Sequence, residues 1–217
     1  MAKIEGIQAK LLKDSFRSVL KQKGYAFFDG NKAYNINIIG IRSKNRRGDK
    51  YDDAMNVIYR NEDLEWEVLS CPITTDPGRK ILGKPINKDG TAILVPNQYK
   101  GTYKIGLHGK SNRYTALVQR LGKVKVYRDS NLDSTLDMDK DSIQEGMFGI
   151  NIHKHSGPNE REHVYASSAG CQVFKITTDF YEFMELCNKS TDKFGNSFTY
   201  TLLEEGDIQN ETNNYEE

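Results

Sequence analysis

The sequence predicts an α+β protein that is mostly β, built on a curved antiparallel sheet or a β-sandwich. Short runs of β-branched and aromatic residues recur at close intervals through the middle of the chain, separated by turn residues. Amphipathic segments with helical spacing lie near both ends. Because 217 residues can bury a substantial core, we expect one main domain over residues 34–204, preceded by a helical lead-in over residues 1–33.

The first predicted element is a helix over residues 7–23, which Gly24 ends. Its apolar side carries Leu11, Leu12, Phe16, Val19 and Leu20. We expect this helix to pack on the sheet. The alternative is a docking helix for a virion protein or another protein partner.

Strand-like runs follow, and their frequency favours antiparallel neighbours in a curved or sandwiched sheet. They cover residues 35–41, 55–59, 65–69, 91–95, 103–107, 114–119 and 123–127.

A histidine-bearing strand then precedes a cysteine in a turn of small residues. Period-2 alternation gives this strand an aliphatic face and a polar face. The polar face carries Asn151, His153 and His155. A catalytic thiol needs an imidazole within reach, so we expect His153 to be the base for Cys171, with His155 as the alternative.

The cysteine turn reads Ser167-Ser168-Ala169-Gly170-Cys171. Small side chains leave its backbone amides unshielded, and Gly170 can adopt backbone angles that other residues avoid. We therefore expect the amides of this turn to hold a developing oxyanion.

The chain is predicted to end in a helix from about residue 178 to 193, a stop at Gly195, and a strand over residues 197–203. The apolar stripe of the helix carries Phe180, Phe183, Met184 and Cys187. Residues 205–217 contain acidic residues and asparagines but no Lys or Arg, which is typical of a disordered tail.

These motifs resemble the L,D-transpeptidase (YkuD-like) family, whose strand ending in His is followed by a Ser/Thr-His-Gly-Cys turn and then Arg or Asn. The segment over residues 74–78 also resembles the family's Thr-Pro-x-Gly turn. The chain departs from the family pattern at Lys154, Ala169 and Gln172.

The resemblance implies acyl transfer on peptidoglycan stem peptides through a Cys171 thioester, with cross-linking or hydrolysis as the outcome. It implies catalytic roles for Cys171, His153, Gly170 and Ser168. It implies substrate-binding roles for Gln172, His155, Ala169 and Asn151. No cofactor or metal is expected. The alternative is a non-catalytic phage virion or cell-wall-binding protein that retains the fold.

Because Gln172 carries no charge, basic residues elsewhere are expected to hold the substrate carboxylate. The candidates are Arg42, Arg46, Lys154 and Arg161. We expect Cys71 and Cys187 to be structural, His163 to lie in a loop, and His108 to cap a hairpin or line the cleft rim. The acidic segment over residues 129–137 has part of a calcium-loop pattern, but Ser134 and Lys140 replace its glycine and glutamate, so a solvated turn is favoured.

A net charge of +1 gives no field that would attract nucleic acid. No apolar run is long enough to span a membrane, and the polar start does not predict a signal peptide. We therefore expect synthesis in the cytoplasm, with access to the cell wall in a virion or at lysis.

Overall fold

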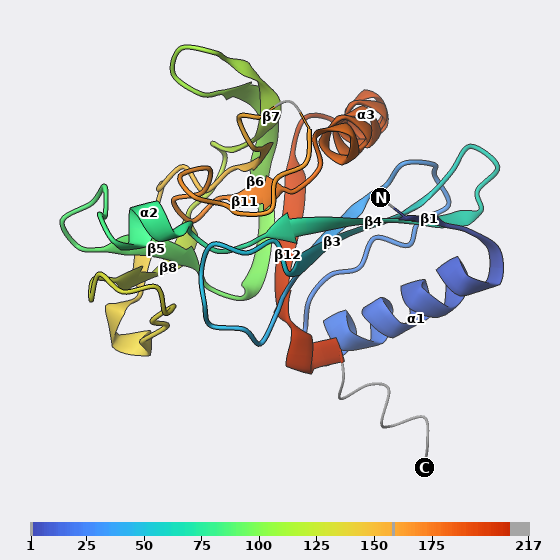
Figure 1. The fold of residues 1–217 in the computed structure, drawn as a ribbon. Helices are drawn as coiled ribbons and strands as arrows, with labels where there is room; N and C mark the ends of the chain where they lie inside the picture. The colour runs from blue at the N-terminus through green and yellow to red at the C-terminus, as the bar shows by residue number, and fades with distance from the viewer. Residues whose placement is uncertain (1, 158, 209–217) are drawn as a thin grey trace.

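The computed structural model describes residues 2–157 and 159–208, and a large mixed sheet forms its centre (Figure 1). In spatial order, the strands of this sheet are β1 (Ala2–Ile4), β4 (Trp66–Thr74), β11 (Gln172–Phe174), β10 (Ile152–Lys154), β7 (Tyr114–Gln119), β6 (Asn97–His108), β12 (Phe198–Glu204), β2 (Asn37–Arg42) and β3 (Asp53–Arg60).

The large sheet closes on itself, because β3 pairs with β4 along its whole length, from Asp53 opposite Ile73 to Arg60 opposite Trp66. The α+β, mostly β class is confirmed, but the predicted sandwich is wrong: the strands form a closed barrel. Closure depends on β4, which pairs with β3 on one edge and with β1 and β11 on the other.

A smaller sheet packs beside the large one and consists of β5 (Thr91–Leu94), β8 (Val124–Asp129) and β9 (Gln144–Gly146). A short helix, α2 (Arg79–Leu82), precedes β5, and a 3-10 turn, η1 (Lys140–Ser142), precedes β9.

Helix α1 (Gly6–Gln22) packs against β4, as Figure 1 shows, which confirms the packed helix. Its buried residues are Ala9, Phe16, Val19 and Leu20. Leu11 was expected on this buried side but is 65% exposed, because the contact with the sheet is narrower than the apolar stripe.

Helix α3 (Thr177–Phe194) follows β11 and covers the opposite part of the sheet (Figure 1). The predicted apolar stripe is confirmed: Phe180, Phe183, Met184 and Cys187 are all buried. Gly195 ends the helix with a φ of 81°, a backbone angle that favours glycine.

The predicted disordered tail is wrong for residues 205–208, which form a helical turn. Ile208 packs against the core cluster beneath α1, and Asp207 pairs with Lys23. Residues 209–217 lie outside the described part of the chain. No helix within the described residues is long and apolar enough to cross a membrane.

Candidate functional site

Two short parallel strands inside the sheet bring the expected histidine and cysteine to one of its faces. Strands β10 and β11 pair with His153 opposite Val173. Cys171 immediately precedes β11, so it lies across from Asn151 and on the same face as His153. The parallel arrangement was not predicted, yet it brings the two residues together.

The Cys171 thiol is held by backbone groups of the segment that leads into β10. The Asn151 N–H lies 3.4 Å from Sγ, and Sγ lies 3.5 Å from the carbonyl of Gly149, to which the thiol donates. Burial raises the pKa of Cys171 to about 11, while the Asn151 amide opposes this shift. At neutral pH the resting group is therefore a thiol.

His153 is held as a neutral ring with one defined tautomer. Its Nδ1 lies 2.7 Å from the carbonyl of Lys154, which can only accept, so Nδ1 carries the proton. Burial, helped by the neighbouring His108, lowers the pKa of His153 to about 3. Nε2 has no hydrogen-bond partner among the described residues, so its lone pair is available to accept a proton.

Tyr114 contacts His153 and is near enough to Cys171 for the charge of a thiolate to affect its pKa. Its hydroxyl donates to the carbonyl of Lys154 at 2.9 Å and lies 3.3 Å from Nδ1 of His153. Burial and then the charge of a Cys171 thiolate raise the pKa of Tyr114. Within the described chain, no hydrogen bond joins His153 to the thiol. Catalytic hydrogen bonds are often loose in a free enzyme and tighten when substrate binds.

A second imidazole stacks on His153. The ring centres of His108 and His153 are 4.0 Å apart and the rings are inclined by 22°. Asn151 accepts from the backbone N–H of Gln119 through Oδ1, so its Nδ2 donates to Nδ1 of His108 at 3.0 Å. His108 therefore carries its proton on Nε2. His108 thus lies beside His153, and its place at the rim of a cleft stays a prediction.

The cysteine turn is held by side chains that were expected to take part in chemistry. Ser168 is buried, donates to the carbonyl of Cys171 at 2.8 Å and accepts from Gly170 N–H at 3.1 Å. The Gly170 amide is thus occupied and is not free for an oxyanion. The amides of Ala169 and Cys171 make no hydrogen bond within the described residues.

Gly170 is required in this turn for two reasons. Its φ is +110°, and a Cβ there would lie 2.3 Å from the carbonyl oxygen of Ala92. The glycine therefore lets the turn approach the smaller sheet closely, which fixes the position of Cys171.

Gln172 is corrected from a substrate-binding residue to a structural one. Its side chain is fully buried, donates to the carbonyl of Gly170 at 3.2 Å and accepts from the Tyr200 hydroxyl at 2.9 Å. A neutral amide satisfies both partners, whereas a buried Arg in its place would need a counter-charge. Asn151 is likewise 8% exposed and serves to fix His108.

The other histidines are separated from the reactive pair. His155 is 1% exposed, donates from Nε2 to the carbonyl of Lys175 and accepts at Nδ1 from Gly157 N–H, so it is neither the base nor a substrate contact. His163 lies in a loop, 3.7 Å from Asp49 and against Tyr165, which agrees with its expected loop position.

Of the basic residues expected at the cleft, Arg42 and Arg46 form ion pairs within the fold, whereas Lys154 and Arg161 contact or lie near tyrosine side chains. Arg42 is wholly buried and forms an ion pair with Asp76, so it cannot contact substrate. Arg46 pairs with Glu204. Lys154 lies over the Tyr114 ring at 4.8 Å and stays beside the site, and Arg161 is half-buried near Tyr51.

The acidic segment over residues 129–137 folds as a turn tied by its own side chains. Asn131 donates to Asp133 and Asp137, and the backbone of Asp137 donates to Asp129. Within the described residues, no group of three or more His, Cys, Asp or Glu side chains could hold a metal ion.

No protein-family model and no curated protein matches the chain. The resemblance to L,D-transpeptidases therefore depends on the motif residues and on their placement. Sequence reasoning missed Tyr114, Gln119 and Tyr200, which hold the site, because their polar atoms act through contacts distant in sequence.

Proposed function

We propose that this protein is a cysteine acyltransferase or peptidase that acts on peptidoglycan stem peptides, as the resemblance to L,D-transpeptidases implies. The observation that carries the proposal is the His153 tautomer. A backbone carbonyl holds the Nδ1 proton and leaves the Nε2 lone pair on the face that Cys171 shares. This is the arrangement that a general base for a thiol requires.

The reaction would begin from a neutral thiol and a neutral imidazole, because the pKa of Cys171 is raised to about 11 and that of His153 is lowered to about 3. Nε2 would take the thiol proton as Sγ attacks the peptide carbonyl. The imidazolium would be stabilised by its Nδ1–H bond to the carbonyl of Lys154. Before attack, Sγ must turn away from the Gly149 carbonyl.

The tetrahedral oxyanion would be held by the free amides of Ala169 and Cys171 rather than by Gly170. The His153 proton would then pass to the departing amine, leaving a thioester on Cys171. An acceptor amine would release a cross-linked product, and water would release a free carboxylate. Access to the wall in a virion or at lysis remains an expectation from the sequence.

A non-catalytic wall-binding or virion protein is the second candidate. It is favoured by the raised thiol pKa and by the absence of a His153–thiol hydrogen bond within the described chain. A protein that had lost its chemistry would retain the buried turn and the stacked histidines for stability alone.

Acylation of the native protein distinguishes the two candidates. The protein would be incubated with a β-lactam acylator and with peptidoglycan peptides, and the intact mass and the products would be measured. The enzyme requires an adduct on Cys171 that is absent from Cys171→Ala and present in Cys187→Ala. Inertness of Cys171 towards both reagents in folded protein would support the non-catalytic candidate.

A further inference from the structure

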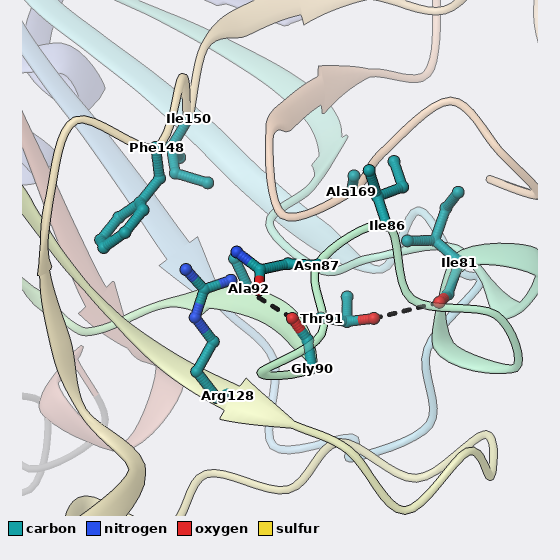
Figure 2. A pocket seen from close by; sticks show the side chains of 10 residues that line it. All are labelled: Ile81, Ile86, Asn87, Gly90, Thr91, Ala92, Arg128, Phe148, Ile150 and Ala169. Atoms are coloured by element: carbon teal, nitrogen blue, oxygen red, sulfur yellow. Dashed lines mark hydrogen bonds between the residues drawn. The ribbon is translucent and has the colours of Figure 1, made fainter.

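A cavity of about 220 Å³ lies beside the cysteine turn, between that turn and the smaller sheet (Figure 2). Ala169 from the turn and Ile150 from the segment before β10 are among the residues that line it. The thiol lies close to both residues, because Cys171 belongs to the same turn as Ala169 and its Sγ contacts the backbone of Gly149 and Asn151, on either side of Ile150. The cavity is therefore adjacent to Cys171 without including it.

Arg128 from β8 supplies a positive charge to this cavity. It is 9% exposed, it stacks on Phe148 with its guanidinium carbon 4.7 Å from the ring centre, and it donates to the side chain of Gln144 and the carbonyl of Gly90. Within the described residues, no carboxylate lies within ion-pair distance, and Nη2 makes no hydrogen bond. Burial lowers the pKa of Arg128, and the charge of Asp89, which contacts Gln144 rather than the guanidinium, partly opposes this shift.

An unpaired buried cation is unusual, because buried charges in proteins are normally paired. The other buried arginine of this chain, Arg42, follows that rule through Asp76. An anion from outside the chain would give Arg128 the direct ion pair that Asp89, beyond contact distance, does not form.

The other lining residues define what kind of anion fits. The Asn87 side chain points towards the same space as Arg128 in Figure 2, and because its oxygen accepts from Asp89 N–H, its Nδ2 is a second donor. Aliphatic residues contribute much of the rest of the lining, namely Ile81, Ile86, Ala92, Ile150 and Ala169. The volume is below the range of about 300–1,000 Å³ for whole-ligand pockets, so it suits one residue of a longer substrate.

We propose that this cavity binds a carboxylate-bearing residue of the peptide substrate, with Arg128 and Asn87 gripping the carboxylate and the aliphatic lining contacting its side chain. The proposal rests on the proposed function, because it places this residue next to the bond that Cys171 attacks. It gives Arg128 the carboxylate-binding role that was expected of Arg42, Arg46, Lys154 or Arg161.

Binding is measured without chemistry, using the full chain carrying Cys171→Ala. The probes are N-acetylalanine, which has a carboxylate, and N-acetylalaninamide, which does not, titrated by NMR chemical-shift changes. We expect Arg128→Gln to weaken the carboxylate probe roughly 10- to 100-fold and Asn87→Ala to weaken it roughly 2- to 10-fold. The amide probe should bind weakly to all forms.

Arg60→Gln is the matched control, because Arg60 also stacks on an aromatic ring, Trp66, and donates to a backbone carbonyl, but lies outside the cavity. It should leave binding unchanged. If Arg128→Gln does not fold, Asn87→Ala and the amide probe still decide the outcome, since Asn87 is exposed.

Equal binding of the two probes, or of parent and both cavity variants, would overturn the cavity proposal even if Cys171 is reactive. Selective carboxylate binding that needs Arg128, in a protein whose Cys171 is inert, would retain the cavity and remove the proposed catalysis. The two proposals can therefore fail separately.

Discussion

Two buried polar clusters of this protein differ in how completely they are paired. In the Arg42 cluster, formed by Arg42, Asp53, Thr75 and Asp76, the guanidinium donates to Thr75 Oγ1, to the carbonyls of Thr75 and Leu94, and pairs with Asp76 at 3.1 Å. In the His153 cluster, formed by His108, Tyr114, Asn151 and His153, one nitrogen of each imidazole is fixed and the other has no partner within the described chain.

The difference predicts a structural role for the Arg42 cluster and, under the proposed function, a chemical role for the His153 cluster. A cluster that satisfies every donor gains little from a ligand, whereas one that orients rings and leaves their outer nitrogens free is arranged to meet something else. The comparison therefore predicts that damage to the Arg42 cluster lowers stability, while damage beside His153 lowers activity.

The largest expected effect is on catalysis. Cys171→Ala should reduce turnover of stem peptides by at least about three orders of magnitude, because the nucleophile is lost. Its melting temperature should change little, since Cys171 is partly exposed. The measurement is product formation by mass spectrometry together with thermal unfolding.

Cys187→Ala is the matched control for this prediction, because Cys187 is fully buried in α3. It should destabilise the fold and retain specific activity at low temperature. Turnover that persists in Cys171→Ala would end the proposed mechanism.

The next effect is on folding. Arg42→Met should lower the free energy of unfolding by about 3–5 kcal/mol, because it leaves the buried carboxylates of Asp53 and Asp76 without their counter-charge. Arg46→Met removes a half-exposed pair with Glu204 and should cost less than about 1 kcal/mol. Similar losses in urea denaturation for both variants would contradict the contrast between the clusters.

The third prediction concerns the pH dependence of the thiol. Alkylation by iodoacetamide needs the thiolate, and the pKa of Cys171 is raised to about 11, so the rate should rise roughly tenfold per pH unit from neutral pH towards that value. His153, whose pKa is lowered to about 3, stays neutral over this range and adds no inflection. A plateau near pH 7 would instead indicate a thiolate–imidazolium pair at rest.

The sequence predicted most elements, for physical reasons that are local, and the structure places His153 and Cys171 on one face of neighbouring strands. The strand over residues 114–119 and the stop at Gly195 follow from alternation and from glycine conformation. The pairing of His153 with Cys171 follows from a motif in one continuous segment. These signals need no knowledge of the rest of the chain.

Closure of the sheet and the support of the site could not be predicted in the same way. The strand predicted over residues 65–69 continues as β4 to Thr74, and the carbonyl of Pro72 within this extension accepts from Lys175 N–H. The surroundings of Gln172 and Arg128 depend on what each side chain meets across the fold: Tyr200 for the first, and Phe148 beside a cavity for the second. Because both are arginines, residue type alone could not predict that Arg42 is paired with Asp76 inside the fold while Arg128 lines a cavity.

The smallest expected effect tests how far the cysteine turn depends on its buried support. Tyr200→Phe removes the hydroxyl that donates to Gln172 Oε1 at 2.9 Å, leaving a buried acceptor unpaired at a cost of about 1–2 kcal/mol. Because Gln172 also holds the carbonyl of Gly170, the looser amide should lower activity a few-fold. Tyr99→Phe is the matched control: Tyr99 is the cross-strand neighbour of Tyr200, but its buried hydroxyl donates to the carbonyl of Val95 and not to Gln172, so it should cost similar stability without changing activity. If both variants lose the same stability and neither loses activity, the Gln172 amide is a packing contact alone and the position of Cys171 is set by the backbone of its turn.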